Sequence, residues 1–573
     1  MSALTRVRAA YSRLSEADRP EVWISLRDKE SAEAEARDID ARVAGGETLP
    51  LAGLVAAVKD NIDVAGFPTT AGSPSYAYLP ERDATAVARL RAHGAIVIGK
   101  TNLDQFATGL VGVRSPYGAV RNAWDPERIS GGSSSGSAVA VALGIVDLAL
   151  GTDTAGSGRV PAALNGIVGV KPTRGLIPAT GVVPACRSLD CVTVFARDLA
   201  LARRATELLS GEDGLDPLAR SASEIATGRV DVPAARPRVG IPAARHLVGL
   251  ADGWAEAFGA AADRLAGAGV EIVEIDIDPL LEAAALLYEG AFVAERYAAV
   301  GAHIEAHRDL IGPDLDPSVA SIILGGSLPT AAELFSDMEK LDRLARLGRT
   351  RLQGFDALLT PTTTWHPSLA DLAADPIGAN SRMGRFTNFA NLLDMSSLAI
   401  PSGTVAGLPF GVMLTADAFH DRALAVIAEL LLAPAVDVLV VGAHLTGQPL
   451  NGQLVSAGGS FAAAVTTTPD YRLFALPTSP AKPGMVRVPT GGESIAGELW
   501  TLPATGFSRF VAGLPAPMTI GRVSLSDGRE VAGFLCEAIA TADAADITGY
   551  GGWRGWLSRP SAEPVGLVPQ SMT

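Results

Sequence analysis

The sequence has few cysteines and no long apolar run, and each shortage excludes a class of protein. Three cysteines among 573 residues (Cys186, Cys191 and Cys536) cannot form a framework of several disulfides, and they contain no CxxC pair for zinc. No stretch reaches 18 uncharged apolar residues, and the N-terminus lacks the apolar core of a secretory signal. We therefore expect a cytoplasmic protein that does not span a membrane.

Basic residues are also in short supply. The chain has 47 Lys and Arg against 62 Asp and Glu, a net charge of −15. Sequence-independent binding of nucleic acid needs a basic face, so we expect no nucleic-acid partner. What the chain does have is apolar surface: 48% of its residues are hydrophobic, which supports a large core and excludes wholesale disorder. The length predicts two to four domains.

Short apolar runs alternate with helical patterns over most of the chain. After a helical element at residues 1–50, this alternation continues to residue 432 and favours an α/β domain with a large, mostly buried sheet. The longest apolar run, Ala138–Leu150, contains Asp147 and predicts a buried helix. Residues 210–237 are polar and rich in turn formers, which is typical of a long surface connection.

The pattern changes after a break at Ala433-Pro434-Ala435. Short strands follow, and one pair of alternating runs, Thr519–Leu525 and Glu530–Cys536, encloses Asp527-Gly528, a strong hairpin signal. The sequence thus predicts a small strand-rich domain at residues 436–556. A tail at 557–573 completes the chain.

Two segments match well-known motifs by letter only. Gly94–Thr101 (GAIVIGKT) fits the phosphate-loop pattern, but its central residues predict a strand where that loop must turn toward phosphate. Gly132–Gly136 (GSSSG) fits the esterase elbow, yet no strand leads into it. His303 and His307 lie four residues apart without a third metal ligand. We therefore expect no nucleotide, no metal and no cofactor.

Three other segments together form a candidate catalytic site. They are Ala57–Asp63 (AVKDNID), Ser130–Val139 (SGGSSSGSAV) and Gly151–Ala162 (GTDTAGSGRVPA). Each alone has an ordinary reading as a solvated strand end, a linker or a helix cap. Loops that follow strands of an α/β sheet commonly bind ligands. In this order and wording, with GKTNLDQF and FTNFANLLDMSSLAIPSG, the segments resemble the amidase signature family over residues 50–432.

The resemblance implies a Ser–cisSer–Lys triad on a large mixed twisted sheet flanked by helices. By motif position, Ser157 is the nucleophile, Ser133 the bridging serine in a cis peptide, and Lys59 the base. A serine hydroxyl needs an adjacent base. Burial can supply a neutral lysine by lowering its pKa, and Ser133 can relay a proton between the other two.

The backbone beside the nucleophile is made of small residues. Thr154, Ala155 and Gly156 let a substrate carbonyl approach closely, so we assign their N–H groups to an oxyanion hole. The predicted reaction is acyl transfer to water, with ammonia leaving from a primary amide.

The substrate is suggested by a helix later in the chain. Leu286–Tyr297 (LLYEGAFVAERY) resembles the substrate-recognition helix of the allophanate hydrolases within this family, in which a tyrosine and an arginine hold a small anion; here they are Tyr288 and Arg296. Arginine binds carboxylates bidentately. Arg159, two residues after the nucleophile, is a further candidate. Without the resemblance, these residues would read as packing and surface side chains.

The strand-rich domain resembles the C-terminal domain of the same group. Segments at 440–451, 471–477, 482–488 and 533–537 carry the likeness, which implies a small α+β, γ-glutamylcyclotransferase-like fold assisting decarboxylation. His444 occupies the position implied for that role; a packing histidine is the alternative. The resemblance also suggests a homodimer through the amidase domain. The competing hypothesis is a different small-amide amidase whose appendage is structural or only binds.

Overall fold

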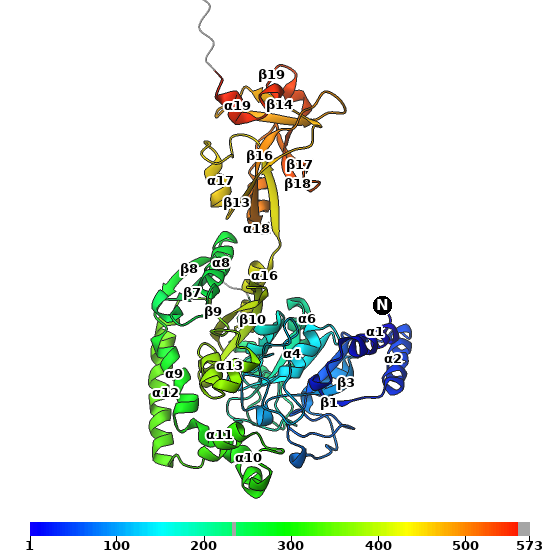
Figure 1. Ribbon diagram of the computed structural model, residues 1–573, viewed down its shortest axis with the longest axis vertical. Coiled ribbons are helices and arrows are strands. Elements are labelled where there is room, and N and C mark those ends of the chain that lie inside the picture. The colour runs from blue at the N-terminus through cyan, green and yellow to red at the C-terminus, as the bar shows by residue number, and fades with distance from the viewer. Residues whose placement is uncertain (232–235, 560–573) are drawn as a thin grey trace, which may run out of the picture. The chain divides into compact units, whose positions relative to one another are not determined.

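The computed structural model describes residues 1–231 and 236–559 (Figure 1). The chain divides into two compact units. The first comprises Met1–Ala262 and Glu271–Glu429, and the second Asp263–Val270 and Leu430–Thr573. Of the predicted tail, only residues 557–559 lie within the described part. The domain boundaries drawn from the sequence stay a prediction.

The first unit is built on an 11-stranded sheet. Its strands, in spatial order, are β1 (Trp23–Leu26), β3 (Ile96–Thr101), β2 (Val55–Lys59), β4 (Leu148–Asp153), β6 (Cys191–Ala196), β5 (Val168–Lys171), β10 (Met395–Val405), β11 (Leu408–Asp417), β9 (Ala357–Pro361), β7 (Arg238–Pro242) and β8 (Glu271–Ile275). Strands β3, β2 and β4 run parallel to one another, as do β9, β7 and β8, and the remaining pairs are antiparallel. The predicted α/β fold with a large mixed sheet is confirmed.

The first unit contains α-helices in addition to this sheet. They are α1 (Ala3–Ala17), α2 (Lys29–Ala44), α3 (Thr85–Ala92), α4 (Ser135–Ala142), α5 (Val160–Asn165), α6 (Leu199–Leu209), α7 (Ala222–Gly228), α8 (Trp254–Gly267), α9 (Asp278–Glu289), α10 (Ala294–Ala306), α11 (Pro317–Gly325), α12 (Ala331–Leu352), α13 (Leu369–Ala374), α14 (Gly378–Met383), α15 (Asn388–Leu392) and α16 (Asp421–Leu432). The N-terminal pair joins the core through side chains such as Val7 and Ile39, which pack in one cluster with Val139 of α4. Among the described residues, no helix is long and apolar enough to cross a membrane.

The run Ala138–Leu150 is not one helix, contrary to the sequence prediction. Helix α4 ends at Ala142, and Gly144 adopts a φ of +70° that a side chain would strain. The carboxylate of Asp147 then accepts the backbone N–H of Val55 at 2.9 Å, and strand β4 begins at Leu148. This turn brings β4 beside β2, so the carboxyl ends of two parallel strands meet at one edge of the sheet.

The phosphate-loop lookalike is a helix stop followed by a strand. Gly94, with a φ of +90°, ends the segment after α3, and residues from Ile96 form β3. Lys100 is buried and pairs with Asp60 at 3.1 Å, so its ammonium serves an internal ion pair. The segment therefore does not form the turn that a phosphate loop requires.

The second unit contains two sheets. The five-stranded sheet has the order β13 (Ser460–Thr466), β16 (Ala496–Pro503), β12 (Ala435–Val440), β18 (Glu530–Cys536) and β17 (Met518–Ser524), and the other consists of β15 (Lys482–Arg487), β14 (Tyr471–Leu476) and β19 (Ala545–Asp546). Its helices are α17 (Asn451–Ser456), α18 (Ala504–Ala512) and α19 (Trp553–Leu557). Strands β17 and β18 pair antiparallel around Asp527-Gly528, which confirms the predicted hairpin.

Candidate active site

Lys59 lies at the end of β2 and is fully buried. Its Nζ donates to the Oγ of Ser133 and to the Oγ1 of Thr152, each at 2.8 Å. Ser133 stands 74 residues away in the chain and follows a cis peptide bond after Gly132. The structure therefore brings the predicted base and bridging serine into direct contact.

Burial dominates the protonation of Lys59. Removal from water lowers the pKa of this amine from 10.5 to about 7, although the carboxylates of Asp104, Asp190 and Asp153 each act to raise it. At neutral pH a large fraction of Lys59 is thus uncharged. A neutral amine has the lone pair that a general base needs.

Ser157 follows β4 and is 1% exposed. Its Oγ lies 3.5 Å from the carbonyl oxygen of Gly109, a long contact that leaves the hydroxyl weakly held. Ser157 and Lys59 belong to segments at the carboxyl ends of the parallel strands β4 and β2. Their catalytic roles, and that of Ser133, stay a prediction that this placement permits.

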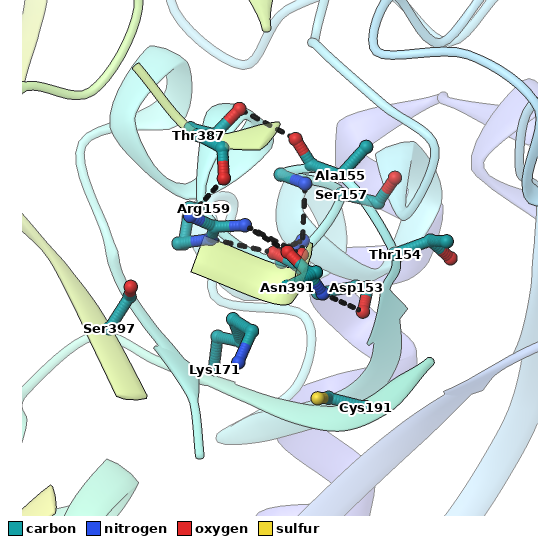
Figure 2. Close-up of polar contacts among 12 residues, drawn as sticks. Asp153, Thr154, Ala155, Ser157, Arg159, Lys171, Cys191, Thr387, Asn391 and Ser397 are labelled. Carbon is teal, nitrogen blue, oxygen red and sulfur yellow. Dashed lines mark hydrogen bonds and ion pairs between the residues drawn. The ribbon is translucent and has the colours of Figure 1, made fainter. Parts of the chain in front are cut away.

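The loop around Ser157 is held from within by Asp153. Its carboxylate accepts the N–H of Gly156 and of Gly158, each at 2.9 Å, and two contacts from Arg159 at 2.8 and 2.9 Å (Figure 2). Burial is the largest single influence and raises the pKa of Asp153, but the charge and hydrogen bond of Arg159, the charge of Lys171 and the N–H of Gly158 together bring the pKa below its usual value. Asp153 is therefore an anionic hub for the loop.

The contacts of Asp153 contradict one predicted oxyanion donor, Gly156. The N–H of Gly156 already donates to Asp153, so it is not available to a substrate oxygen. Within the described residues, no acceptor pairs with the N–H of Thr154, Ala155 or Ser157. These three are the donors that the loop leaves free.

The contacts of Arg159 also contradict its predicted role in substrate binding. Its guanidinium is fully buried and, besides Asp153, donates to the carbonyl oxygen of Thr387 at 2.9 Å and to Asn391 Oδ1 at 2.8 Å (Figure 2). Since Nε, Nη1 and Nη2 all have protein partners, the arginine ties the loop to helix α15. We reassign it from substrate binding to positioning of the loop.

Further polar residues, not predicted from the sequence, hold the Ser157 loop and the segment around the cis peptide. Thr387 Oγ1 donates to the carbonyl oxygen of Ala155 at 2.6 Å, and Thr154 Oγ1 donates to Asp190 at 2.5 Å. Burial raises the pKa of Asp190 to about 6, against hydrogen bonds that lower it. Asp104 accepts the N–H groups of Val111 and Gly112 beside the cis peptide. Thr387 and Asp104 stand inside segments already quoted for the family likeness, which was the available signal.

Tyr288 and Arg296 lie together beside the nucleophile loop. Arg296 is 1% exposed; its Nη2 donates to the Tyr288 hydroxyl and its Nη1 to Thr108 Oγ1, both at 2.9 Å. Thr108 precedes Gly109, whose carbonyl contacts Ser157. Arg296 Nε has no hydrogen-bond partner among the described residues. A buried cation with a free donor near a serine hydroxyl suits a small anionic ligand.

His444 belongs to the second unit and borders a cavity of about 700 Å³. Its Nε2 lies 3.0 Å from Gln453 Oε1, and its ring stacks on Phe534 at 4.9 Å. Burial lowers the pKa of His444, helped by the charge of Lys482 and opposed by the bond to Gln453. Lys482 and Arg509 also line the cavity, and their charge suits it to an anion.

Comparisons with known proteins match both units. Residues 6–425 match the amidase family model, and residues 436–558 match the model of the allophanate hydrolase C-terminal domain. The urea amidolyase of Saccharomyces cerevisiae is 40% identical over 93% of this chain, which spans 31% of that relative's length. A glutamyl-tRNA(Gln) amidotransferase chain of Symbiobacterium thermophilum is 35% identical over 69% of this chain and 85% of its own.

Solved structures agree with these matches. An allophanate hydrolase of Kluyveromyces lactis is 38% identical, with a TM-score of 0.69 over 97% of both chains. The urea amidolyase of the same organism is also 38% identical, with a TM-score of 0.70 over 97% of this chain and 36% of its own.

Proposed function

Because the chain belongs to the amidase family and carries an allophanate hydrolase C-terminal domain, we propose that it hydrolyses allophanate. This substrate is urea with a carboxylate on one nitrogen. The chain is thus an amidase-signature hydrolase, and its specific substrate is the part proposed here. The observation that carries the proposal is the pair formed by the half-buried Tyr288 and the buried Arg296 beside the Ser157 loop.

In the proposed reaction, Ser157 Oγ attacks the carbonyl carbon of the primary amide. Its proton passes to Ser133 as Ser133 gives its own to neutral Lys59. The N–H groups of Thr154, Ala155 and Ser157 bind the oxyanion. The C–N bond then breaks, the leaving nitrogen takes the proton back, and ammonia departs. The same relay then activates a water molecule, which attacks the acyl-enzyme and releases N-carboxycarbamate.

Charge supports an anionic substrate at this site. The protein carries −15 overall, which repels small anions at long range, so a local cation must hold the carboxylate. Among the described residues, Arg296 forms no ion pair with a carboxylate. Its charge is therefore not neutralised by a salt bridge, and its buried Nε has no hydrogen-bond partner among the described residues.

Replacing Arg296 by lysine is expected to lower kcat/KM for allophanate by about 100-fold or more, because lysine cannot reproduce a bidentate carboxylate contact. Ammonia release is measured from allophanate, malonamate, biuret and uncharged amides. Arg13→Lys, at an arginine that donates to the carbonyl oxygen of Gly144, serves as the control. A wild-type preference for uncharged amides, or an equal loss on charged and uncharged substrates, would overturn the proposal.

We also propose that the second unit assists decarboxylation of N-carboxycarbamate. The support is the cavity in which His444 lies with two cations, Lys482 and Arg509. Such a cavity can hold a dianion, and a histidine of lowered pKa can exchange a proton with the nitrogen that becomes ammonia. If the second unit only binds or stabilises, loss of the His444 side chain should leave the release of the second ammonia unchanged.

With His444→Ala, the first ammonia is expected at the normal rate and the second up to about 100-fold more slowly, within the contribution of one acid–base group. Spontaneous decarboxylation of N-carboxycarbamate limits the length of this lag. ¹³C NMR would detect the accumulated intermediate directly. His93→Ala, a half-buried histidine of the first unit, is the matched control. Release of both ammonia equivalents at the wild-type rate would leave the unit a structural or binding role.

Location and assembly complete the proposal. The three cysteines are free and buried, which supports a reducing cytoplasmic setting. A homodimer through the first unit stays a prediction from the family likeness. Helix α12 offers a face for it: Phe335 and Met338 are 68% and 45% exposed, its first half is mainly acidic, and its second half is rich in arginine. Two such helices would complement each other when antiparallel.

A further inference from the structure

The second contact of Lys59 is with a residue that has no part in the proposed proton relay. Thr152 precedes Asp153 at the end of β4 and is 1% exposed. Its Oγ1 lies 2.8 Å from Lys59 Nζ, the same distance as the Oγ of Ser133. The lysine thus sits between two hydroxyls, only one of which leads toward the nucleophile.

The position of Thr152 is fixed from two further directions. Asn61 Nδ2 donates to Thr152 Oγ1 at 3.2 Å, and its other contact is the carbonyl oxygen of Val183, also at 3.2 Å. The backbone of Thr152 is bound by Ser134, whose Oγ donates to the Thr152 carbonyl at 3.0 Å. Contacts within the protein therefore hold this hydroxyl in place.

We propose that Thr152 is a positioning residue that directs the lone pair of neutral Lys59 at Ser133 and stabilises the ammonium formed when the relay operates. A hydroxyl oxygen has two lone pairs. Lys59 and Asn61 each donate into one, so the hydrogen of Thr152 points away from Lys59. When Lys59 is neutral and donates one N–H to Thr152, its lone pair accepts the Ser133 hydrogen across the 2.8 Å contact in which the ammonium is the donor.

The same contact acts on the charged form. After proton transfer, Lys59 is a buried ammonium, and an acceptor at hydrogen-bond distance favours it. The other charges that act on this group are the carboxylates of Asp104, Asp190 and Asp153, from three different segments. Loss of the Thr152 acceptor therefore disfavours the ammonium while these carboxylates stay in place.

The test compares Thr152→Val with Thr152→Ser. Valine keeps the shape and removes the acceptor, so we expect kcat to fall about 10- to 100-fold with KM nearly unchanged, the range for losing a hydrogen bond to a charged group. The acid limb of kcat against pH is expected to move to lower pH by about one pH unit. Serine, which keeps the hydroxyl, should restore both. Thr152→Ala replaces valine if the larger side chain prevents folding.

Thr193→Val is the matched control. Thr193 is a fully buried threonine on the neighbouring strand β6, and its hydroxyl has no hydrogen-bond partner among the described residues. An unmoved pH limb in the Thr152 variants, or a serine variant as impaired as valine, would overturn the inference. It rests on the proposed lysine-based mechanism, but the measurement can use any primary amide that the wild-type protein hydrolyses. Failure of allophanate as substrate is thus distinguishable from failure of the role of Thr152.

Discussion

Replacing Ser157 by alanine is expected to abolish amide hydrolysis and leave the protein folded. In serine hydrolases, loss of the nucleophile typically lowers kcat by about 10⁴-fold or more. The residual activity comes from the oxyanion donors and from substrate binding. The fold should tolerate the change because the Ser157 hydroxyl makes only a 3.5 Å contact, whereas the loop is shaped by Asp153 and Arg159. Ammonia release measures the activity, and thermal unfolding measures the fold.

Ser135→Ala provides the comparison for that variant. Ser135 stands in the same glycine- and serine-rich segment as Ser133, is equally buried, and donates to the carbonyl oxygen of Asn102 at a long 3.3 Å. It should retain most of the activity. Substantial turnover by Ser157→Ala in a correctly folded preparation would show that another group attacks the amide.

Lys59→Met is expected to lower kcat by about 10²- to 10⁴-fold, the range for a general base, and at the same time to stabilise the protein. The pKa of Lys59 falls from 10.5 to about 7 on folding. Between these values the unfolded chain binds a proton that the folded protein does not, so the free energy of unfolding of the wild type rises with pH. At pH 7 and below, the wild type therefore carries most of this penalty.

Methionine removes the titrating group and fills similar space. We expect the free energy of unfolding to increase by roughly 1–3 kcal/mol at pH 7, and its slope between pH 7 and pH 10 to flatten. Chemical unfolding at several pH values measures both. Lys100→Met gives the opposite sign, because it strands the buried Asp60 carboxylate of an ion pair, at a cost of about 3–5 kcal/mol. A destabilised Lys59→Met protein with an unchanged slope would contradict the expectation.

Much of the fold follows from local sequence signals. The hairpin of β17 and β18 and the strand that ends at Lys59 are encoded in alternation, turn residues and short apolar runs. The prediction for the run Ala138–Leu150 was wrong because its apolar residues serve two elements, and only the left-handed Gly144 between them separates helix from strand. Periodicity does not distinguish a buried strand from a continued helix.

The candidate site, like the fold, is predictable from the sequence only in part. Lys59, Ser133 and Ser157 stand in motifs whose letters identify them. The direction of a side chain is different: nothing in the sequence shows that Asp153 turns back onto its own loop, which takes Gly156 and Arg159 away from the substrate. The partners that fix the loop, such as Thr387, 232 residues from Ala155, meet it only through the fold.

The burial of all three thiols has a practical consequence for labelling the protein. Burial raises the pKa of Cys186 to about 12 and of Cys191 to about 11, and the pKa of Cys536 is also raised. Since the thiolate is the reactive form, maleimides should modify these residues slowly. A cysteine introduced on each unit would then be the fastest-reacting thiol without removal of any native one. Paired fluorophores at such positions could follow the distance between the amidase unit and the C-terminal unit during turnover.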